Sequence, residues 1–176
     1  MSEGATSVPS TAGPAPLVSV GMPVHNGAAF LQEAIDSVLR QDYPNLELVI
    51  CDNASEDGTE AICRHAASSD PRVRYLRNGT NIGLVGNFRR TLDEARGRYF
   101  TWLAHDDVLS DPADRTPRAG YLEDHPEAVL CACAVRLLNS EYGVSGEVID
   151  VPELAPEKWP AGRNEFFRLP HGWDGL

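Results

Sequence analysis

Apolar runs and amphipathic stretches alternate along the chain from residue 17 to about residue 138. The runs are short and rich in Val, Ile and Leu, which is typical of strands buried inside a sheet. We expect strands at 17–24, 46–51, 73–76, 98–104 and 128–138. Between them, apolar residues recur at helical spacing, which predicts helices at 28–40, late in 52–66, at 81–95, and weakly up to about residue 125. This alternation predicts an α/β fold, in which a mainly parallel sheet carries helices on both faces.

The two ends of the chain lack this pattern. Residues 1–16 consist mostly of Ser, Pro, Gly, Ala and Thr and have little to bury, so we expect a disordered tail before a domain at 17–150. Beyond it, the segment 151–176 contains four prolines that interrupt any long element, and we expect it to be irregular. The final Gly-Leu is neither a cap nor a stop, which suggests a chain cut short.

Charge excludes one large class of partner. The 176 residues include 15 Lys and Arg against 26 Asp and Glu, a formal net charge of −11 with neutral His. A surface this acidic repels a phosphate backbone, so we expect no nucleic-acid partner. No apolar run reaches the roughly 18 to 20 residues of a membrane span, and no signal peptide is recognisable. The four cysteines have neither disulfide-framework nor zinc-site spacing, so we expect a cytoplasmic protein, with the inner face of the membrane as an alternative.

Polar residues follow several of the expected strands directly. Asp52 comes after the second strand, Asp57 lies at the start of the next helix, and Asp106-Asp107 follow the fourth strand. Ligands of open parallel sheets bind at the carboxyl ends of the strands, so these carboxylates predict a site for Mg²⁺ or Mn²⁺ there. Two plainer interpretations stay open: Asp52 forms a turn, and the Asp pair caps a helix. Strand alternation places His105 on the side opposite to Asp106, as a packed residue.

Other nucleotide-binding and nucleophilic motifs are missing. Gly83-Leu84-Val85-Gly86 has neither the spacing of a dinucleotide-binding fingerprint nor that of a P-loop. No Gly-x-Ser-x-Gly elbow occurs, and no cysteine has an obvious base beside it. Dehydrogenase, P-loop and serine-hydrolase functions therefore lose support. Asn26, after the first strand, is the expected N-cap of the first helix.

Four segments carry a family resemblance by their order and spacing: VSVGMPVHN (18–26), LELVICDNASEDGT (46–59), VRYLRNGTNIG (73–83) and ARGRYFTWLAHDDVL (95–109). Together they resemble the nucleotide-sugar-binding half of family 2 glycosyltransferases of the GT-A fold, a Rossmann-like fold for nucleotide-diphospho-sugar transferases. The resemblance covers about residues 17–138. It implies an enzyme that transfers a sugar from a nucleotide-diphosphate donor to an acceptor hydroxyl with inversion, assisted by Mg²⁺ or Mn²⁺.

Individual roles follow from that resemblance. It implies that Asp52 contacts the nucleotide base and that Asp106 and Asp107 bind the metal and the diphosphate. It also implies that the turn after the first strand lies against the nucleoside. The residues implied there, and as secondary contacts, are Pro23, Val24, Asn26, Asp57, Asn81 and Asn87.

Two departures from the family pattern matter. The metal motif usually reads Asp-x-Asp-Asp, and here its first position is Ala104. The general base normally comes from an acceptor-binding half, of which 151–176 would be only the start, and Asp174 is the one late carboxylate in a suggestive setting. The acceptor, a glycan, lipid or small molecule, is not specified. Two alternatives remain: a truncated, inactive module that binds a nucleotide sugar, and a nucleotidyltransferase, for which a cation after the first strand is missing.

Overall fold

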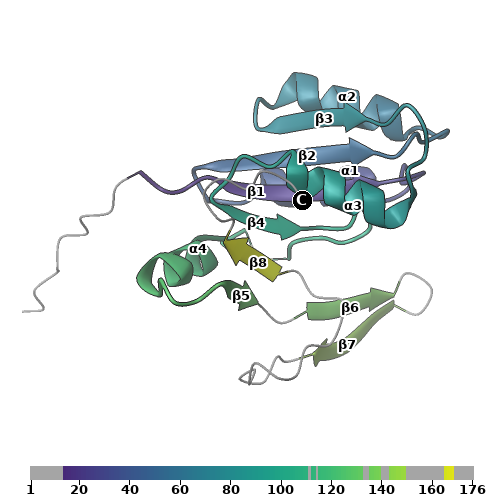
Figure 1. Ribbon diagram of the computed structural model, residues 1–176. Coiled ribbons are helices and arrows are strands. Elements are labelled where there is room, and N and C mark those ends of the chain that lie inside the picture. Colours follow the sequence, from purple (N-terminus) through teal and green to yellow (C-terminus); the bar gives the residue numbers. More distant parts are fainter. Residues whose placement is uncertain are drawn as a thin grey trace, which may run out of the picture.

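The computed structural model describes residues 14–110, 112–113, 115–132, 135–139, 143–149 and 165–168 (Figure 1). Strands and helices alternate along its first two thirds, as the sequence pattern predicts. The elements in chain order are β1 (Val18–Val24), α1 (Leu31–Leu39), β2 (Leu46–Asp52), α2 (Thr59–Ser69), β3 (Val73–Arg77), α3 (Gly83–Asp93), β4 (Tyr99–Trp102), α4 (Arg115–Asp124), β5 (Leu130–Ala132), β6 (Val135–Asn139), β7 (Gly143–Ile149) and β8 (Glu165–Arg168).

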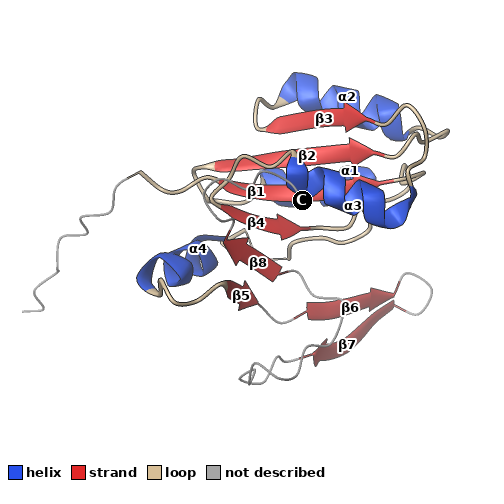
Figure 2. Cartoon of the chain, in the orientation of Figure 1, coloured by secondary structure: helices blue, strands red, loops and turns tan. Residues whose placement is uncertain are grey.

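A six-stranded sheet with the order β3-β2-β1-β4-β8-β5 forms the centre of the molecule (Figure 2). The first four of these strands are parallel, as the sequence predicts, and β1 pairs with both β2 and β4. β8 runs antiparallel to β4 and β5, between which it lies. Because Val24 pairs with Asp52 and Asp52 pairs with Arg77, the carboxyl ends of β1, β2 and β3 are level with one another.

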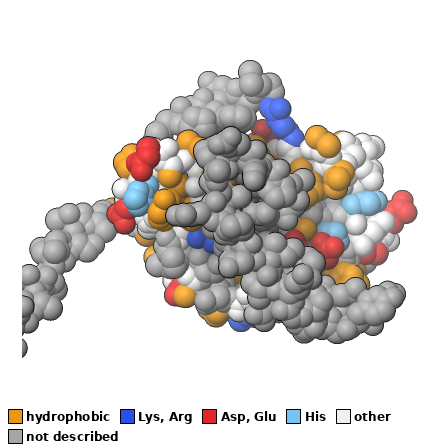
Figure 3. Space-filling model, turned by 90° about the horizontal axis from the view of Figure 1, so that it is seen from below, with side chains coloured by type: hydrophobic (Ala, Val, Ile, Leu, Met, Phe, Trp, Pro, Cys, Tyr) orange, Lys and Arg blue, Asp and Glu red, His pale blue; other side chains and the backbone are white. Residues whose placement is uncertain are grey.

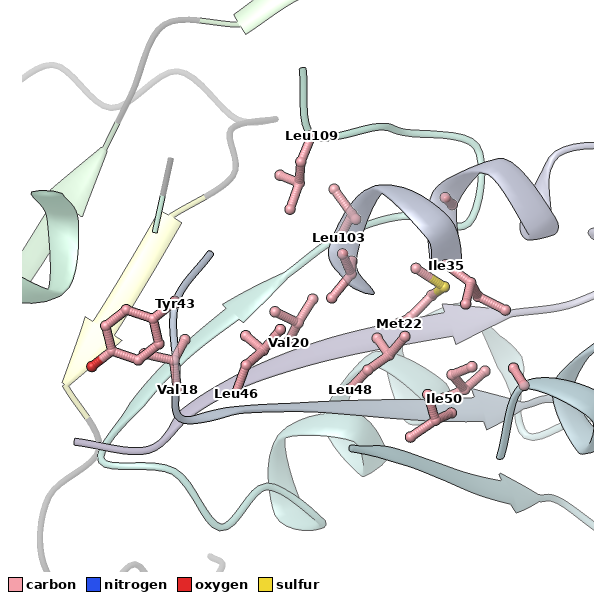
Figure 4. Packing of buried hydrophobic residues seen from close by; sticks show 14 of the residues in the cluster. Val18, Val20, Met22, Ile35, Tyr43, Leu46, Leu48, Ile50, Leu103 and Leu109 are labelled. Carbon is pink, nitrogen blue, oxygen red and sulfur yellow. The ribbon is translucent and has the colours of Figure 1, made fainter. Parts of the chain in front are cut away.

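The two faces of β1 differ in chemistry, which decides how the helices cover them. Val18, Val20 and Met22 join β2 and α1 residues in the main hydrophobic core (Figure 4). On the other face, a Cβ added at Gly21 would lie only 2.6 Å from the Phe100 ring and 3.0 Å from Cβ of Thr91 in α3. Glycine therefore lets α3 approach the sheet closely, and helices cover both faces.

Helix α3 docks on the sheet largely through polar groups. Its buried residues are Asn87 and Thr91. The indole nitrogen of Trp102 in β4 donates to the Thr91 hydroxyl at 2.9 Å, and the Asn87 amide donates to the Cys51 carbonyl at 2.8 Å. Hydrogen bonds of this kind give buried polar groups a partner, and a buried polar group left without one costs about 1–3 kcal/mol. Meanwhile Leu84 and Val85, in the first turn, are exposed.

Two expected elements differ from the structure. The run 128–138, expected as one strand, contains β5 and β6, which belong to different sheets because β5 pairs with β8 and β6 pairs with β7. Helix α1 begins at Leu31, and the residue in its N-cap position is Phe30. Asn26 is not the cap: it has a φ of 53°, and its side-chain oxygen accepts from the Glu56 N–H at 2.8 Å.

The two ends of the chain are described only in part. Most of the expected tail 1–16 lies outside the described residues, as does most of 151–176. Within the latter segment, which we expected to be irregular, β8 is part of the central sheet. Among the described residues, no helix combines the length and the apolar character that a membrane crossing needs.

Candidate functional site

A cavity of about 300 Å³ opens at the carboxyl ends of β1, β2 and β4, beside the first turns of α3. Its walls combine apolar side chains with amides, imidazoles and one carboxylate. The lining residues are Pro23, Val24, His25, Asn53, Asn81, Leu84, Phe88, Ala104, His105 and Asp106. Figure 3 shows hydrophobic, His and acidic side chains together at the right-hand side of the molecule, toward which the parallel strands point in Figure 1. The strand-end rule therefore predicted the place of the cavity.

Four residues implied by the family resemblance line this cavity: Pro23, Val24, Asn81 and Asp106. The same wall contains residues that the sequence did not single out as site residues, above all Leu84 and Phe88 of α3. Both belong to α3, the helix that apolar spacing predicts at 81–95. The signal that could have found them is their position directly after β3, because helix starts there face the same sheet edge.

A chain of asparagine amides joins the ends of β2 and β3 to the start of α3. The Asn53 amide nitrogen donates to the Asn81 oxygen at 2.8 Å, and its oxygen accepts from the Ile82 N–H at 2.9 Å and from the Asn78 amide at 2.9 Å. Asn78 also donates to the Asn87 oxygen at 3.0 Å. Asn87 thus lies behind the cavity wall rather than in it, where it holds α3 in place.

Asn26 and Asp57 tie the loop after β1 to the loop after β2. The Asn26 N–H donates to the Ser55 hydroxyl at 2.9 Å. Asp57 accepts from the Ala28 N–H and the Thr59 N–H, both at 3.0 Å. The Thr59 side chain contributes most to lowering the pKa of the Asp57 carboxyl, and these two backbone bonds lower it further. Neither side chain is among the cavity-lining residues. The structure therefore gives both residues a part in shaping the loops around the site.

Asp52 is completely buried, and both of its carboxylate oxygens have partners within the protein. One accepts from the Ser55 N–H at 2.8 Å, and the other accepts from the Tyr75 hydroxyl at 2.9 Å and from Arg77 at 2.5 Å. Burial by itself would raise the pKa of Asp52, but these hydrogen bonds together lower it, so the carboxylate is held ionised. Asp52 does not line the cavity, and its contact with a base stays a prediction.

Asp106 and Asp107 lie in a turn after β4, closed by a bond from the Asp107 N–H to the Ala104 carbonyl at 3.1 Å. Both are exposed, and Asp106 lines the cavity. Although Asp107 keeps part of its surface exposed, partial desolvation of its carboxyl raises the pKa of that group. The neighbouring Asp106 charge adds to the rise, and His105 opposes it. A bound cation would offset the repulsion between these two adjacent carboxylates.

His105 corrects one expectation from the sequence. It lines the cavity together with Asp106, instead of lying on the opposite side. Strand alternation does not apply to it because β4 already ends at Trp102. Its ring covers Gly27 so closely that a Cβ there would lie 2.3 Å from Cδ2 of His105.

The described residues contain no group of three or more His, Cys, Asp or Glu side chains arranged to hold a metal ion. What they offer is the pair Asp106 and Asp107, since the position of a further carboxylate is occupied by Ala104. Two hard oxygen donors fit Mg²⁺ or Mn²⁺, which keep several waters and take further ligands from substrate phosphates. Asp174, the candidate base, lies outside the described residues.

Comparison with known proteins supplies a family. The sequence model of glycosyl transferase family 2 matches residues 19–146, which include β2, β3, β4 and all but the first residue of β1. EpsE of Bacillus subtilis, which carries a provisional glycosyltransferase name, is 37% identical over 141 residues, 78% of this chain and 50% of its own. An uncharacterized glycosyltransferase of Rickettsia prowazekii is 42% identical over 93 residues, 53% of this chain and 28% of its own.

Solved structures agree on the architecture. A mannosyltransferase from Pyrobaculum calidifontis, in complex with GDP-Man and Mn²⁺, has a TM-score of 0.63 and 27% identity, covering 69% of this chain and 36% of its own. TarS of S. aureus, residues 1–349 in complex with UDP-GlcNAc, has a TM-score of 0.64 at 21% identity, covering 70% and 36%. The chain spans half or less of the length of each of these proteins.

Proposed function

Because this chain belongs to glycosyl transferase family 2, we propose that its strand-end cavity binds a nucleotide-diphosphate sugar and that the sugar passes to an acceptor hydroxyl with inversion. The observation that supports this most directly is the arrangement of the cavity. Asp106 lies at its β4 side, while Asn53 and Asn81 lie at its β2 and α3 side. A diphosphate at the carboxylates then places the nucleoside among amides and apolar side chains.

The carboxylates need a counter-charge before they can accept a diphosphate. Asp106 and Asp107 would hold a divalent cation between themselves and the phosphate oxygens, as the Mn²⁺ in the mannosyltransferase complex suggests for a relative. When bound, such a cation neutralises charge that develops on the leaving diphosphate. The protein's own part is to fix these two carboxylates on the tight turn after β4, with Asp106 in the cavity wall.

The apolar wall of the cavity holds the donor in place. Pro23 and Val24 from β1 and Phe88 from α3 offer surfaces against which a nucleoside can pack. The Asn53 and Asn81 amides are bonded to each other without any ligand, so this part of the wall is formed in advance. Pre-formed positioning of this kind can contribute up to about 7–11 kcal/mol to lowering a reaction barrier. The general base of the transfer remains unassigned among the described residues.

Transfer and binding can be tested separately on the same chain. Purified protein is incubated with Mn²⁺, with UDP-, GDP- or dTDP-sugars and with a panel of glycan, lipid and small-molecule acceptors. Release of the nucleoside diphosphate and the anomeric configuration of any glycosylated acceptor are measured. We expect a nucleotide-dependent product of inverted configuration that Asp106→Asn abolishes. A chain that binds these nucleotides with Mn²⁺ and yields no product is instead the inactive binding module. A chain that binds none of them contradicts the proposal.

A further inference from the structure

His25 lines the cavity, and its ring is held by two asparagine side chains through one nitrogen only. The Asn81 amide nitrogen lies 3.2 Å from Nε2 of His25, and the Asn26 amide nitrogen lies 3.5 Å from the same atom. Whether Nε2 donates or accepts in these contacts depends on which groups of the two amides face it. The other bonds of Asn81 and Asn26 settle that question.

Backbone N–H groups fix the orientation of both amides. The Asn81 oxygen accepts from the Gly83 N–H at 2.9 Å, and the Asn26 oxygen accepts from the Glu56 N–H at 2.8 Å. A backbone N–H can only donate, so in each case it meets the carbonyl oxygen of the side chain and the NH₂ group is left facing His25. Two NH₂ donors therefore converge on Nε2. If Nε2 carried a proton, it would itself be a donor and could accept a hydrogen bond from neither amide.

In the uncharged form of the ring, the proton therefore lies on Nδ1. Among the residues that the structure describes, nothing accepts a hydrogen bond from Nδ1 of His25. The side chain is exposed at the cavity wall, so this N–H is available to a ligand. A neutral donor suits an uncharged oxygen better than a phosphate, for which a cation is the stronger partner.

The position of His25 in the cavity indicates which part of the donor it meets. It is bonded to Asn81, which is bonded to Asn53 at the end of β2, whereas Asp106 follows β4 on the other side of β1. With the diphosphate at the carboxylates, His25 lies toward the nucleoside. Resting on the proposed function, we propose that Nδ1–H of His25 donates a hydrogen bond to an uncharged oxygen of the nucleoside, and that Asn81 and Asn26 set this tautomer.

The tautomer is tested in the free protein, independently of any activity. The full chain is labelled with ¹⁵N-histidine, and the His25 ring signals are assigned by their loss in His25→Gln. In alkaline solution we expect a protonated-type shift at Nδ1 and an unprotonated-type shift at Nε2. In Asn81→Asp, where carboxylate oxygens replace the NH₂ group, we expect the proton to move to Nε2. A wild-type ring protonated at Nε2 overturns the inference.

The ligand contact is tested by calorimetry with UDP and Mn²⁺. An Asn side chain places an amide near the Nδ1 position of a histidine, and a Gln side chain places one near Nε2. We expect His25→Gln to bind UDP about three- to tenfold more weakly, and His25→Asn to stay within about twofold of wild type. Both variants should bind inorganic pyrophosphate with Mn²⁺ as wild type does. Equal UDP affinities in wild type and His25→Gln overturn the contact.

Modified nucleotides identify the oxygen. The base carbonyls are probed with 2-thio- and 4-thio-UDP, and the ribose hydroxyls with 2′-deoxy- and 3′-deoxy-UDP. We expect one of these changes to weaken binding to wild type and to have no further effect in His25→Gln. If each modification costs both proteins the same, His25 does not donate to the nucleoside. Wild-type protein that binds no nucleotide overturns the proposed function, while the tautomer measurement still stands on its own.

Discussion

Asp52 is a buried carboxylate that accepts hydrogen bonds from an arginine and a tyrosine on one oxygen and from a backbone N–H on the other. The first two donors are within reach because β3 pairs in register with β2 and brings Tyr75 and Arg77 beside Asp52. An ion pair of this kind stabilises a fold mainly in the sense that breaking it is costly, since each partner is left without its counterpart. Only the Asp52 end is fully buried; the Arg77 side chain is about one third exposed.

We expect Asp52→Asn to lower the free energy of unfolding by about 1–3 kcal/mol, because its NH₂ group would face donors. The folded-state pKa of Asp52 is lowered, so its stabilisation is present above the unfolded pKa of about 3.9 and is lost as pH falls through the folded value. Urea unfolding of both proteins from neutral to acid pH measures this. The difference should shrink at the acid end, and it should be absent in the control Glu56→Gln, whose side chain is exposed. A constant difference across the whole pH range would contradict this account.

Asp107 differs from Asp52 in having no hydrogen-bond donor among the described residues and a raised pKa. We expect Asp107→Asn to weaken binding of a nucleoside diphosphate at least about tenfold with Mn²⁺ present, and far less without it, because its role lies in holding the cation. Calorimetry with and without Mn²⁺ gives the two affinities. Equal losses under both conditions would remove Asp107 from the metal site.

At the scale of elements, the loop from β1 to α1 is packed against the turn after β4 with no spare room. We expect Gly27→Ala to destabilise the fold by about 1–3 kcal/mol and to displace His105, because the new Cβ would lie 2.3 Å from its ring and 2.7 Å from Cγ2 of Val24. Chemical denaturation and the NMR signals of the His105 ring report the two effects. The matched control is Gly58→Ala, whose Cβ would make an ordinary 3.5 Å contact with Ala28. Identical behaviour of the two variants would show that the loop yields without cost.

The strands could be predicted from the sequence because a strand buried on both faces is simply a short apolar run, as in β1 and β2. The helix faces could not. Helix α2 buries Thr59, Cys63 and Ala66, whereas the apolar residue Ala61 of the same helix is exposed. A small cysteine and a hydrogen-bonded threonine pack as well as larger apolar residues. The periodicity of apolar residues alone therefore does not show which face of the helix is buried.

The site was predictable in its place and only partly in its members. The family resemblance implied Pro23 and Val24, and the rule for strand ends pointed to Asp106; all three line the cavity. The rule could not show that Asp52 is turned inward, because that depends on Tyr75 and Arg77, which lie 23 and 25 residues further along the chain. Nor could it find the amide chain through Asn53 and Asn78, since an asparagine in a sequence carries no mark of its partners.

For the molecule as a whole, binding should be visible as stability. The cavity is built by residues of β1, of α3 and of the loops that follow β1, β2, β3 and β4, which come together only in the folded state. The unfolded chain therefore has no such site. At a concentration of about 100 times the dissociation constant, a nucleoside diphosphate with Mn²⁺ should contribute about 2.7 kcal/mol and raise the melting temperature by about 5–10 °C. Differential scanning fluorimetry with UDP, GDP and dTDP measures this. No shift with any of the three, against a uridine control, would contradict nucleotide binding.

The position of β8 between β4 and β5 has a consequence for the order in which the protein assembles. Within the described part of the chain, β5 pairs only with β8, although β8 follows it by more than 30 residues. As the polypeptide leaves the ribosome, β1 to β4 can therefore pair as they appear, but the backbone groups of β5 must wait for Glu165–Arg168. Closing that long loop is the late and slow step of such a topology, since its entropic cost comes before its contacts form. A nascent chain halted between β5 and β8 would present an open edge at β4, to which a neighbouring chain could add a strand.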